Sequence, residues 1–198
     1  MNFFLLHIIV LQDDRIMTTI TDSSQIDALQ DPDSSVQEVD LRFERIGNTG
    51  ATALANALKV NLSVQELCLS GNQIGNMGAT ALADALKVNT SVQELDLRFN
   101  EIGGVGATVL ADALKVNASV QALYLNFNKI GDVGTTVLAN ALKVNASVQR
   151  IWVNSSYEKL FRQSIDIRNT VREMIDVLPL PTAGGHVVMY EWIAEYAF

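Results

Sequence analysis

A pattern of apolar and polar positions repeats every 28 residues through the middle of the chain. Four copies begin at Ser34, Leu62, Thr90 and Ala118, and an incomplete fifth begins at Ala146. The second and third copies share 20 of their 28 residues. A fixed period of this length is typical of a solenoid, in which each unit buries its apolar face only by stacking on its neighbours.

Each copy opens with alternating apolar and polar residues. In the second copy Leu67 and Leu69 alternate with the polar side chains around them, which predicts a short strand with one buried face. The same register in the other copies predicts five strands, near residues 38–41, 66–69, 94–97, 122–125 and 150–153.

A helical pattern follows each strand. Between Gly78 and Lys87 the leucines Leu82 and Leu86 share one helical face, with polar residues opposite. The equivalent segments predict helices at about 50–59, 78–87, 106–115 and 134–143. Because each unit supplies one strand and one helix, the strands should be parallel, with all helices on one side. Helices need more room than strands, so the stack should curve, with its strands on the concave face.

Polar and glycine positions also recur between these elements. We expect one asparagine to bond backbone groups where the strand bends away, at Asn72, Asn100 and Asn128. Glycine at equivalent positions predicts a tight turn before each helix, at Gly47, Gly75, Gly103 and Gly131. A second asparagine is expected to end each helix in the left-handed conformation, at Asn61, Asn89, Asn117 and Asn145. The Asn-x-Ser patterns at these four sites and at Asn154 are interpreted as by-products of the repeat.

The L-x-x-L-x-L-x-x-N-x-I-G core followed by a long helix resembles the ribonuclease-inhibitor-like leucine-rich repeat family over residues 34–154. The resemblance implies an α/β fold, a right-handed solenoid shaped as a horseshoe arc, with parallel strands on its concave face and helices on its convex face. Glu44 and Ser156 stand in place of the asparagine in the first and fifth copies. Looser turns are expected in those two end units.

The chain divides into an N-terminal cap segment at 1–33, repeats at 34–156 and a C-terminal helical cap or tail at 157–198. In the first segment Ile26 and Leu29 predict a short helix. In the last, an apolar stripe predicts a helix ending at Pro179, and the aromatic residues 186–198 form a strand or a second helix. These residues either cover the end of the last repeat or bind a partner.

The apolar run at residues 3–11 leaves three interpretations open. It packs against an end of the solenoid, it is a signal sequence, or translation begins at Met17 and residues 1–16 are dispensable. The run has no basic residue before it, so packing is favoured, and it is too short to span a bilayer.

Net charge limits the classes of partner, and cysteine content indicates the cellular compartment. The formal net charge is −8, from 22 acidic and 14 basic residues. This balance disfavours nucleic acid as a partner and is compatible with a basic protein partner, although excess acid also serves solubility alone. Cys68 is the single cysteine. An internal disulfide is therefore impossible, which favours a cytoplasmic location, or the host cytosol for a secreted effector.

Catalytic motifs do not occur in the sequence. The two histidines, His7 and His186, lie at opposite ends of the chain and far in sequence from Cys68. No zinc-protease, C-x-x-C or phosphate-loop pattern is present. We predict that the protein is not an enzyme, with no catalytic residues, metal, cofactor or small-molecule substrate.

The outward strand positions vary while the buried ones hardly change, which points to a binding face. We predict that its partner-binding residues are Glu66, Glu94, Asp96, Arg98, Tyr124, Asn126 and Trp152. Glu38 should form a like-charged row with Glu66 and Glu94, offset in part by arginines Arg42 and Arg98. Two further aromatics, Phe99 and Phe127, either join this face or pack beneath the following loop.

These observations favour a non-enzymatic protein–protein interaction module with an acidic and aromatic concave face. Similar repeats occur in cytosolic immune sensors and in effectors that intracellular bacteria deliver into host cells. The near-identical copies and the small size of this chain resemble the effectors more. The alternative is a GTPase-activating protein like the Ran activator built on the same repeats. A leucine-rich repeat ubiquitin ligase is a third option, but it would need a catalytic cysteine in a further domain.

Overall fold

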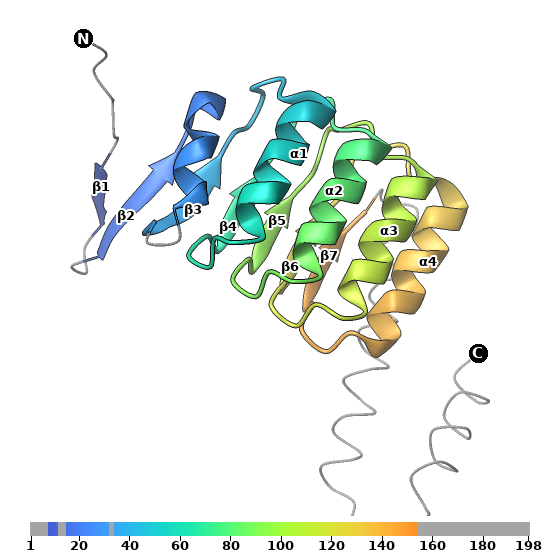
Figure 1. Cartoon of the computed structure of the whole chain (residues 1–198). Coiled ribbons are helices and arrows are strands. Elements are labelled where there is room, and N and C mark those ends of the chain that lie inside the picture. Colours follow the sequence, from blue (N-terminus) through green and yellow to red (C-terminus); the bar gives the residue numbers. More distant parts are fainter. Residues whose placement is uncertain (1–7, 12–14, 32–33, 154–198) are drawn as a thin grey trace, which may run out of the picture.

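The structure is a computed structural model that describes residues 8–11, 15–31 and 34–153. Strands and helices alternate through the repeats, and Figure 1 shows the units side by side. The repeat strands are β3 (Val36–Asp40), β4 (Glu66–Cys68), β5 (Glu94–Asp96), β6 (Ala122–Tyr124) and β7 (Arg150–Trp152). The helices are α1 (Gly47–Leu58), α2 (Asn76–Leu86), α3 (Gly104–Leu114) and α4 (Gly131–Val144).

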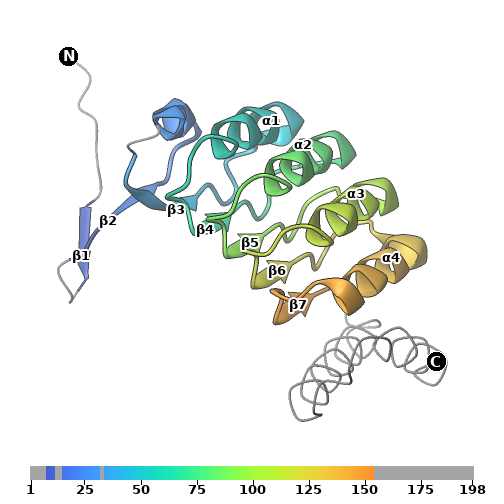
Figure 2. The ribbon, with the colours of Figure 1, turned by 60° about the horizontal axis from the view of Figure 1, so that its bottom comes forward.

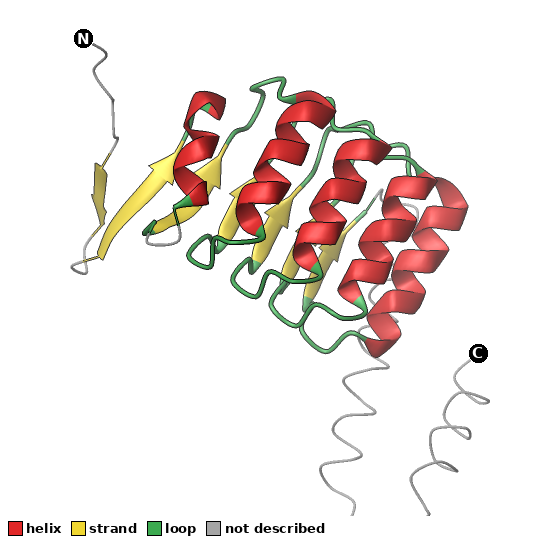
Figure 3. Cartoon of the chain, viewed as in Figure 1, coloured by secondary structure: helices red, strands yellow, loops and turns green. Residues whose placement is uncertain are grey.

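The five repeat strands pair in parallel and in chain order, as predicted. Equivalent residues lie side by side, so that Leu95 pairs with Leu67 on one side and Leu123 on the other. Figures 2 and 3 show the helices together on one side of the sheet. The predicted arrangement of concave strands and convex helices is therefore confirmed.

Two strands that the sequence analysis did not predict extend the sheet at its N-terminal edge. β1 (Ile8–Leu11) pairs antiparallel with β2 (Arg15–Ile20), and β2 pairs in parallel with β3. A 3₁₀ helix, η1 (Ser23–Gln30), follows. It buries Ile26 and Leu29, as the sequence predicted for this segment. The predictions for residues 154–198 lie outside the described residues.

The core is a set of ladders running along the solenoid. Equivalent strand residues are fully buried in successive copies, for example Leu41, Leu69, Leu97 and Leu125. The helices contribute Leu54, Leu82, Leu110 and Leu138 in the same way. Each leucine therefore packs against the equivalent leucines of the neighbouring units. Burial of this apolar surface stabilises the stack by about 25 cal/mol per Å².

All four helices begin two or three residues earlier than predicted. In α2 the first two residues, Asn76 and Met77, are exposed. The hydrophobic pattern marks only the part of a helix that faces the core, so an exposed first turn leaves no apolar signal.

The asparagines that follow the strands satisfy backbone groups where the chain turns away from the strand, as predicted, and those that donate to them belong to the preceding repeat. The Asn100 side chain is buried and accepts hydrogen bonds from the backbone N–H groups of Asn72 (3.0 Å) and Ile74 (2.9 Å). Its amide donates to the carbonyl of Leu69 at 2.9 Å. Such a ladder links neighbouring units through groups that water cannot reach.

The prediction of left-handed helix-ending asparagines is wrong. Asn145 has φ −71°, and the left-handed non-glycine residues of the described chain lie elsewhere, at Phe43, Arg45, Gln73, Phe99 and Phe127. The four asparagines instead form a second buried ladder. Asn89 accepts from the backbone N–H of Val92 at 2.9 Å and donates to the carbonyl of Leu58, one repeat earlier, at 2.9 Å.

Candidate protein-binding surface

The concave face carries two stacked pairs of aromatic rings. Tyr124 and Trp152 occupy neighbouring positions on β6 and β7, with ring centroids 4.8 Å apart and planes 7° from parallel. Phe99 and Phe127 stack in the same way just beyond β5 and β6, at 4.3 Å and 8°. Parallel strands bring equivalent side chains to within about 4.8 Å, which is why aromatics at one repeat position must stack.

Phenylalanine forms an exposed row where the chain leaves the strands. Phe43, Phe99 and Phe127 are 68%, 49% and 63% exposed, so the alternative of packing beneath a loop is wrong. All three have left-handed backbone, with φ of 62°, 54° and 59°. A bulky side chain in this region carries a strain of order 1–2 kcal/mol. We refer to these three residues as the phenylalanine row.

Glycine replaces phenylalanine in the second copy, and the structure shows its effect. Gly71 has φ +72°, and a Cβ there would lie 2.3 Å from Cδ1 of Phe43. The Phe43 ring therefore lies over Gly71, in the space that a side chain in the second copy would take. Phe43 occupies the same outward repeat position as Phe99 and Phe127, although it is not among the predicted partner-binding residues.

Two aspartates of the concave face, Asp40 and Asp96, are paired with the arginines two residues later. Asp96 accepts from Nε (2.9 Å) and Nη2 (2.6 Å) of Arg98 and from its backbone N–H (2.9 Å). Asp40 binds Arg42 similarly, and this hydrogen bond holds the pKa of Asp40 below its ordinary value. Asp96 is only 3% exposed, so its carboxylate is taken up by Arg98 and does not present a free charge to the solvent.

Arg42 and Arg98 donate to the aspartates and not to the row of glutamates beside them. Glu38, Glu66 and Glu94 pair side by side on β3, β4 and β5. The prediction that Arg42 and Arg98 offset this row is therefore wrong. Burial raises the pKa of Glu66, and the neighbouring carboxylates of Glu38 and Glu94 raise it further.

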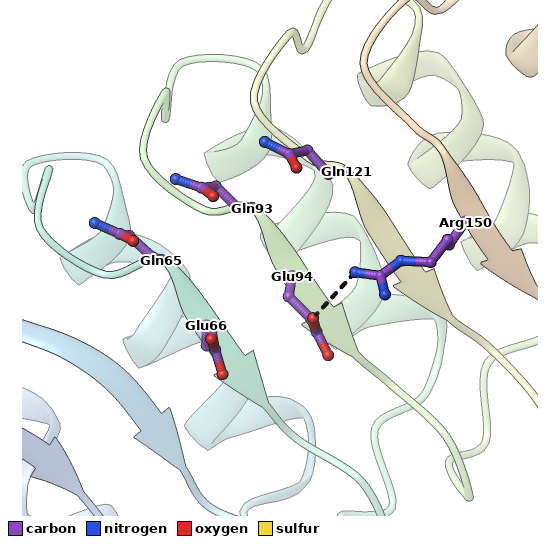
Figure 4. Close-up of a pocket in the computed structure, with 6 residues that line it drawn as sticks. All are labelled: Gln65, Glu66, Gln93, Glu94, Gln121 and Arg150. Carbon is purple, nitrogen blue, oxygen red and sulfur yellow. Dashed lines mark ion pairs between the residues drawn. The ribbon is translucent and has the colours of Figure 1, made fainter. Parts of the chain in front are cut away.

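A shallow pocket of about 200 Å³ lies beside these glutamates. Figure 4 shows its lining residues, which are Gln65, Glu66, Gln93, Glu94, Gln121 and Arg150. The guanidinium of Arg150 on β7 reaches the carboxylate of Glu94 on β5 at 3.8 Å. The intervening position on β6 is Ala122, whose small, buried side chain leaves the path open.

The other predicted site residues lie on the same face. Arg98 places its guanidinium carbon 5.3 Å from the Tyr124 ring centroid, which adds a cation–π contact to the aromatic pair. Asn126 donates to the carbonyl of Val153 at 2.9 Å, so its amide also joins β6 to the end of β7. Fold symmetry thus brings all seven predicted residues together.

Cys68 lies between Asp40 and Asp96 in the same row. Burial raises the pKa of its thiol to about 12, with the two carboxylates adding to the effect. Such a thiol is a poor nucleophile at neutral pH. No cluster of metal-binding side chains occurs in the part of the chain that the structure describes, and His7 and His186 both lie outside it. The described helices include none that is long and apolar enough to cross a bilayer.

Comparison with known proteins agrees with this geometry. A leucine-rich repeat family model matches residues 60–83, 88–111 and 116–139, in register with the 28-residue repeat. The chain contains leucine-rich repeats. No curated protein matches it.

Two solved structures show the same repeat fold. Leiomodin-1 actin-binding site 2 is 21% identical with a TM-score of 0.64, covering 77% of this chain and 94% of its own. The tropomodulin C-terminal domain of Caenorhabditis elegans is 17% identical with a TM-score of 0.66, covering 79% and 98%. At these identities the likeness concerns the fold alone.

Proposed function

We propose that this leucine-rich repeat protein is a non-enzymatic module that binds a protein partner across its concave face. The observation that carries the proposal is the row of exposed phenylalanines, which combines exposure of 49–68% with left-handed backbone. Neither feature stabilises the free protein, whereas rigid aromatic side chains are the commonest anchors of protein interfaces.

The binding residues proposed are Glu66, Glu94, Asp96, Arg98, Tyr124, Asn126 and Trp152, with the phenylalanine row at their edge. In this arrangement Asp96 acts by holding Arg98 over Tyr124 rather than by its own charge. The carboxylates of Glu66 and Glu94 remain to favour a basic partner.

We further infer that the protein works in a cytosol, and that it is an effector delivered there by an intracellular bacterium. The single cysteine supports a cytosolic location, and the near-identical repeats support an effector. Expression of the tagged protein in host cells, followed by fractionation and affinity capture, tests location and partner together.

Actin is the first purified protein to test, because a leiomodin-1 domain of the same fold is described as an actin-binding site. Affinity capture with the full chain, followed by mass spectrometry, supplies other candidates. Multiple-turnover GTP hydrolysis by Ran, with and without the protein, tests the alternative of a GTPase activator.

The decisive experiment compares variants against a captured partner. Replacing both Tyr124 and Trp152 by Ala should weaken binding by about 2 kcal/mol or more, roughly thirtyfold. The matched control replaces Met77 and Val105, which are 76% and 66% exposed on the convex helices, and should leave the affinity unchanged. A partner that is sensitive only to the convex pair would place binding on the helices instead.

A further inference from the structure

The pocket on the concave face contains two glutamates in different surroundings. Glu94 receives the guanidinium of Arg150 from the β7 side at 3.8 Å. Glu66 lies on the opposite side of Glu94, on β4. Its neighbours in the row are Glu38 and Glu94, and all the electrostatic influences on its pKa raise it. Within the described part of the chain, no positively charged group is thus among those that influence the pKa of Glu66, whereas Glu94 has Arg150 beside it.

The lining of the pocket suits a planar cation. Neighbouring parallel strands lie about 4.8 Å apart. Glu66 and Glu94 are paired residues on two such strands, so a guanidinium with its five N–H donors can reach both carboxylates. The side chains of Gln65, Gln93 and Gln121 line the same pocket, and each amide oxygen can accept a further hydrogen bond. Figure 4 shows Glu66 and Glu94 on neighbouring strands, with Arg150 approaching Glu94 from the side away from Glu66.

Arg150 shows that this surface receives a guanidinium, and it leaves room for another. Its contact with Glu94 is long, and the two side chains are 57% and 34% exposed, so the pair is weak. It reaches Glu94 over Ala122, away from Glu66. A second guanidinium can thus enter between Glu66 and Glu94 without displacing it.

We propose that this pocket binds the side chain of an arginine from the protein partner, between Glu66 and Glu94. The proposal rests on the proposed function and names the chemistry that the concave face selects. The aromatic pair on β6 and β7 then contacts apolar residues of the same partner, while the pocket fixes its register through one charged residue.

The test uses the isotope-labelled full chain and three blocked pentapeptides of glycine with a central arginine, lysine or citrulline. Citrulline has the shape of arginine without its charge. In nuclear magnetic resonance titrations, the arginine peptide should shift the side-chain signals of Glu66, Glu94 and Gln93. It should bind at least fivefold more tightly than the lysine peptide, and the citrulline peptide should give no saturable shift.

Variants locate the site. Replacing both Glu66 and Glu94 by Gln should raise the Kd of the arginine peptide at least fivefold. The matched control, Glu44→Gln with Glu101→Gln, changes the net charge equally beyond the C-terminal ends of the strands, outside the pocket, and should leave the Kd unchanged. The backbone amide spectrum of each variant verifies that it is folded.

Equal binding of arginine and citrulline, or of arginine and lysine, would overturn the proposal. An unchanged Kd in the Glu66 and Glu94 variant would do the same. These failures differ from failure of the proposed function. A captured partner that needs Tyr124 and Trp152 but tolerates Glu66→Gln and Glu94→Gln would retain the concave face and remove only the arginine pocket.

Discussion

Asn100 is the residue whose replacement tests how the repeats are joined. Its carbonyl oxygen accepts from two buried backbone N–H groups of the preceding unit, those of Asn72 at 3.0 Å and Ile74 at 2.9 Å. Asn100→Ala leaves both without a partner in a place that water cannot enter. Each buried unsatisfied group costs about 1–3 kcal/mol. We expect the free energy of unfolding to fall by about 2–6 kcal/mol.

Two further variants test whether the loss of stability depends on how many buried N–H groups lose their partner. Asn128 accepts from one buried N–H, that of Ile102 at 3.0 Å, and is itself half-buried, so Asn128→Ala should cost about 1–2 kcal/mol. Asn56 is exposed on α1 and bonded to Lys59 at 3.2 Å. Asn56→Ala should change stability by less than about 0.5 kcal/mol.

Urea unfolding of the full chain, followed by circular dichroism at about 222 nm, measures the stability of all three variants. A cost below about 1 kcal/mol for Asn100→Ala, or one no larger than that of Asn128→Ala, would refute the reasoning. The inter-repeat side-chain bonds would then contribute little beyond apolar stacking.

Three other outcomes are expected. Leu97→Ala should cost about 2–5 kcal/mol in the same assay. Asp96→Ala should cost about 1–2 kcal/mol, because it removes the hydrogen bonds that the buried Asp96 carboxylate accepts from Arg98. Equal costs would mean that the strand faces are assigned wrongly. Glu66→Gln should stabilise the protein at pH 7 by a few tenths of a kcal/mol. Because the folded-state pKa of Glu66 is raised, protonation favours folding, so this advantage should fade as pH falls through that raised pKa and be lost below the ordinary pKa of about 4.5. An advantage that stays constant with pH would mean that the glutamate row has no effect. Cys68, with its pKa raised to about 12, should react with iodoacetamide at pH 8 roughly a thousandfold more slowly than the thiol of the urea-unfolded chain, and equal rates would contradict its burial.

The repeat period determined most of this architecture without any coordinates. Each unit can bury its leucines only against an identical neighbour, so one sequence pattern dictates strand register, helix side and curvature at once. Leu67, Leu95 and Leu123 were placed correctly for this reason. The same symmetry placed Tyr124 beside Trp152, since equivalent positions on adjacent strands must touch.

Tertiary structure decided what the outward side chains do with one another. Arg98 turns to Asp96 rather than to the glutamate row, and Arg150 crosses Ala122 to reach Glu94. Neither contact follows from the 28-residue period, because each depends on which neighbouring side chain is small and which is charged. The β1 and β2 strands lie outside the repeat and were missed for the same reason. The sequence by itself determined the scaffold through repetition, whereas the charge pattern of its binding face arises from contacts between unlike residues, which only the folded chain brings together.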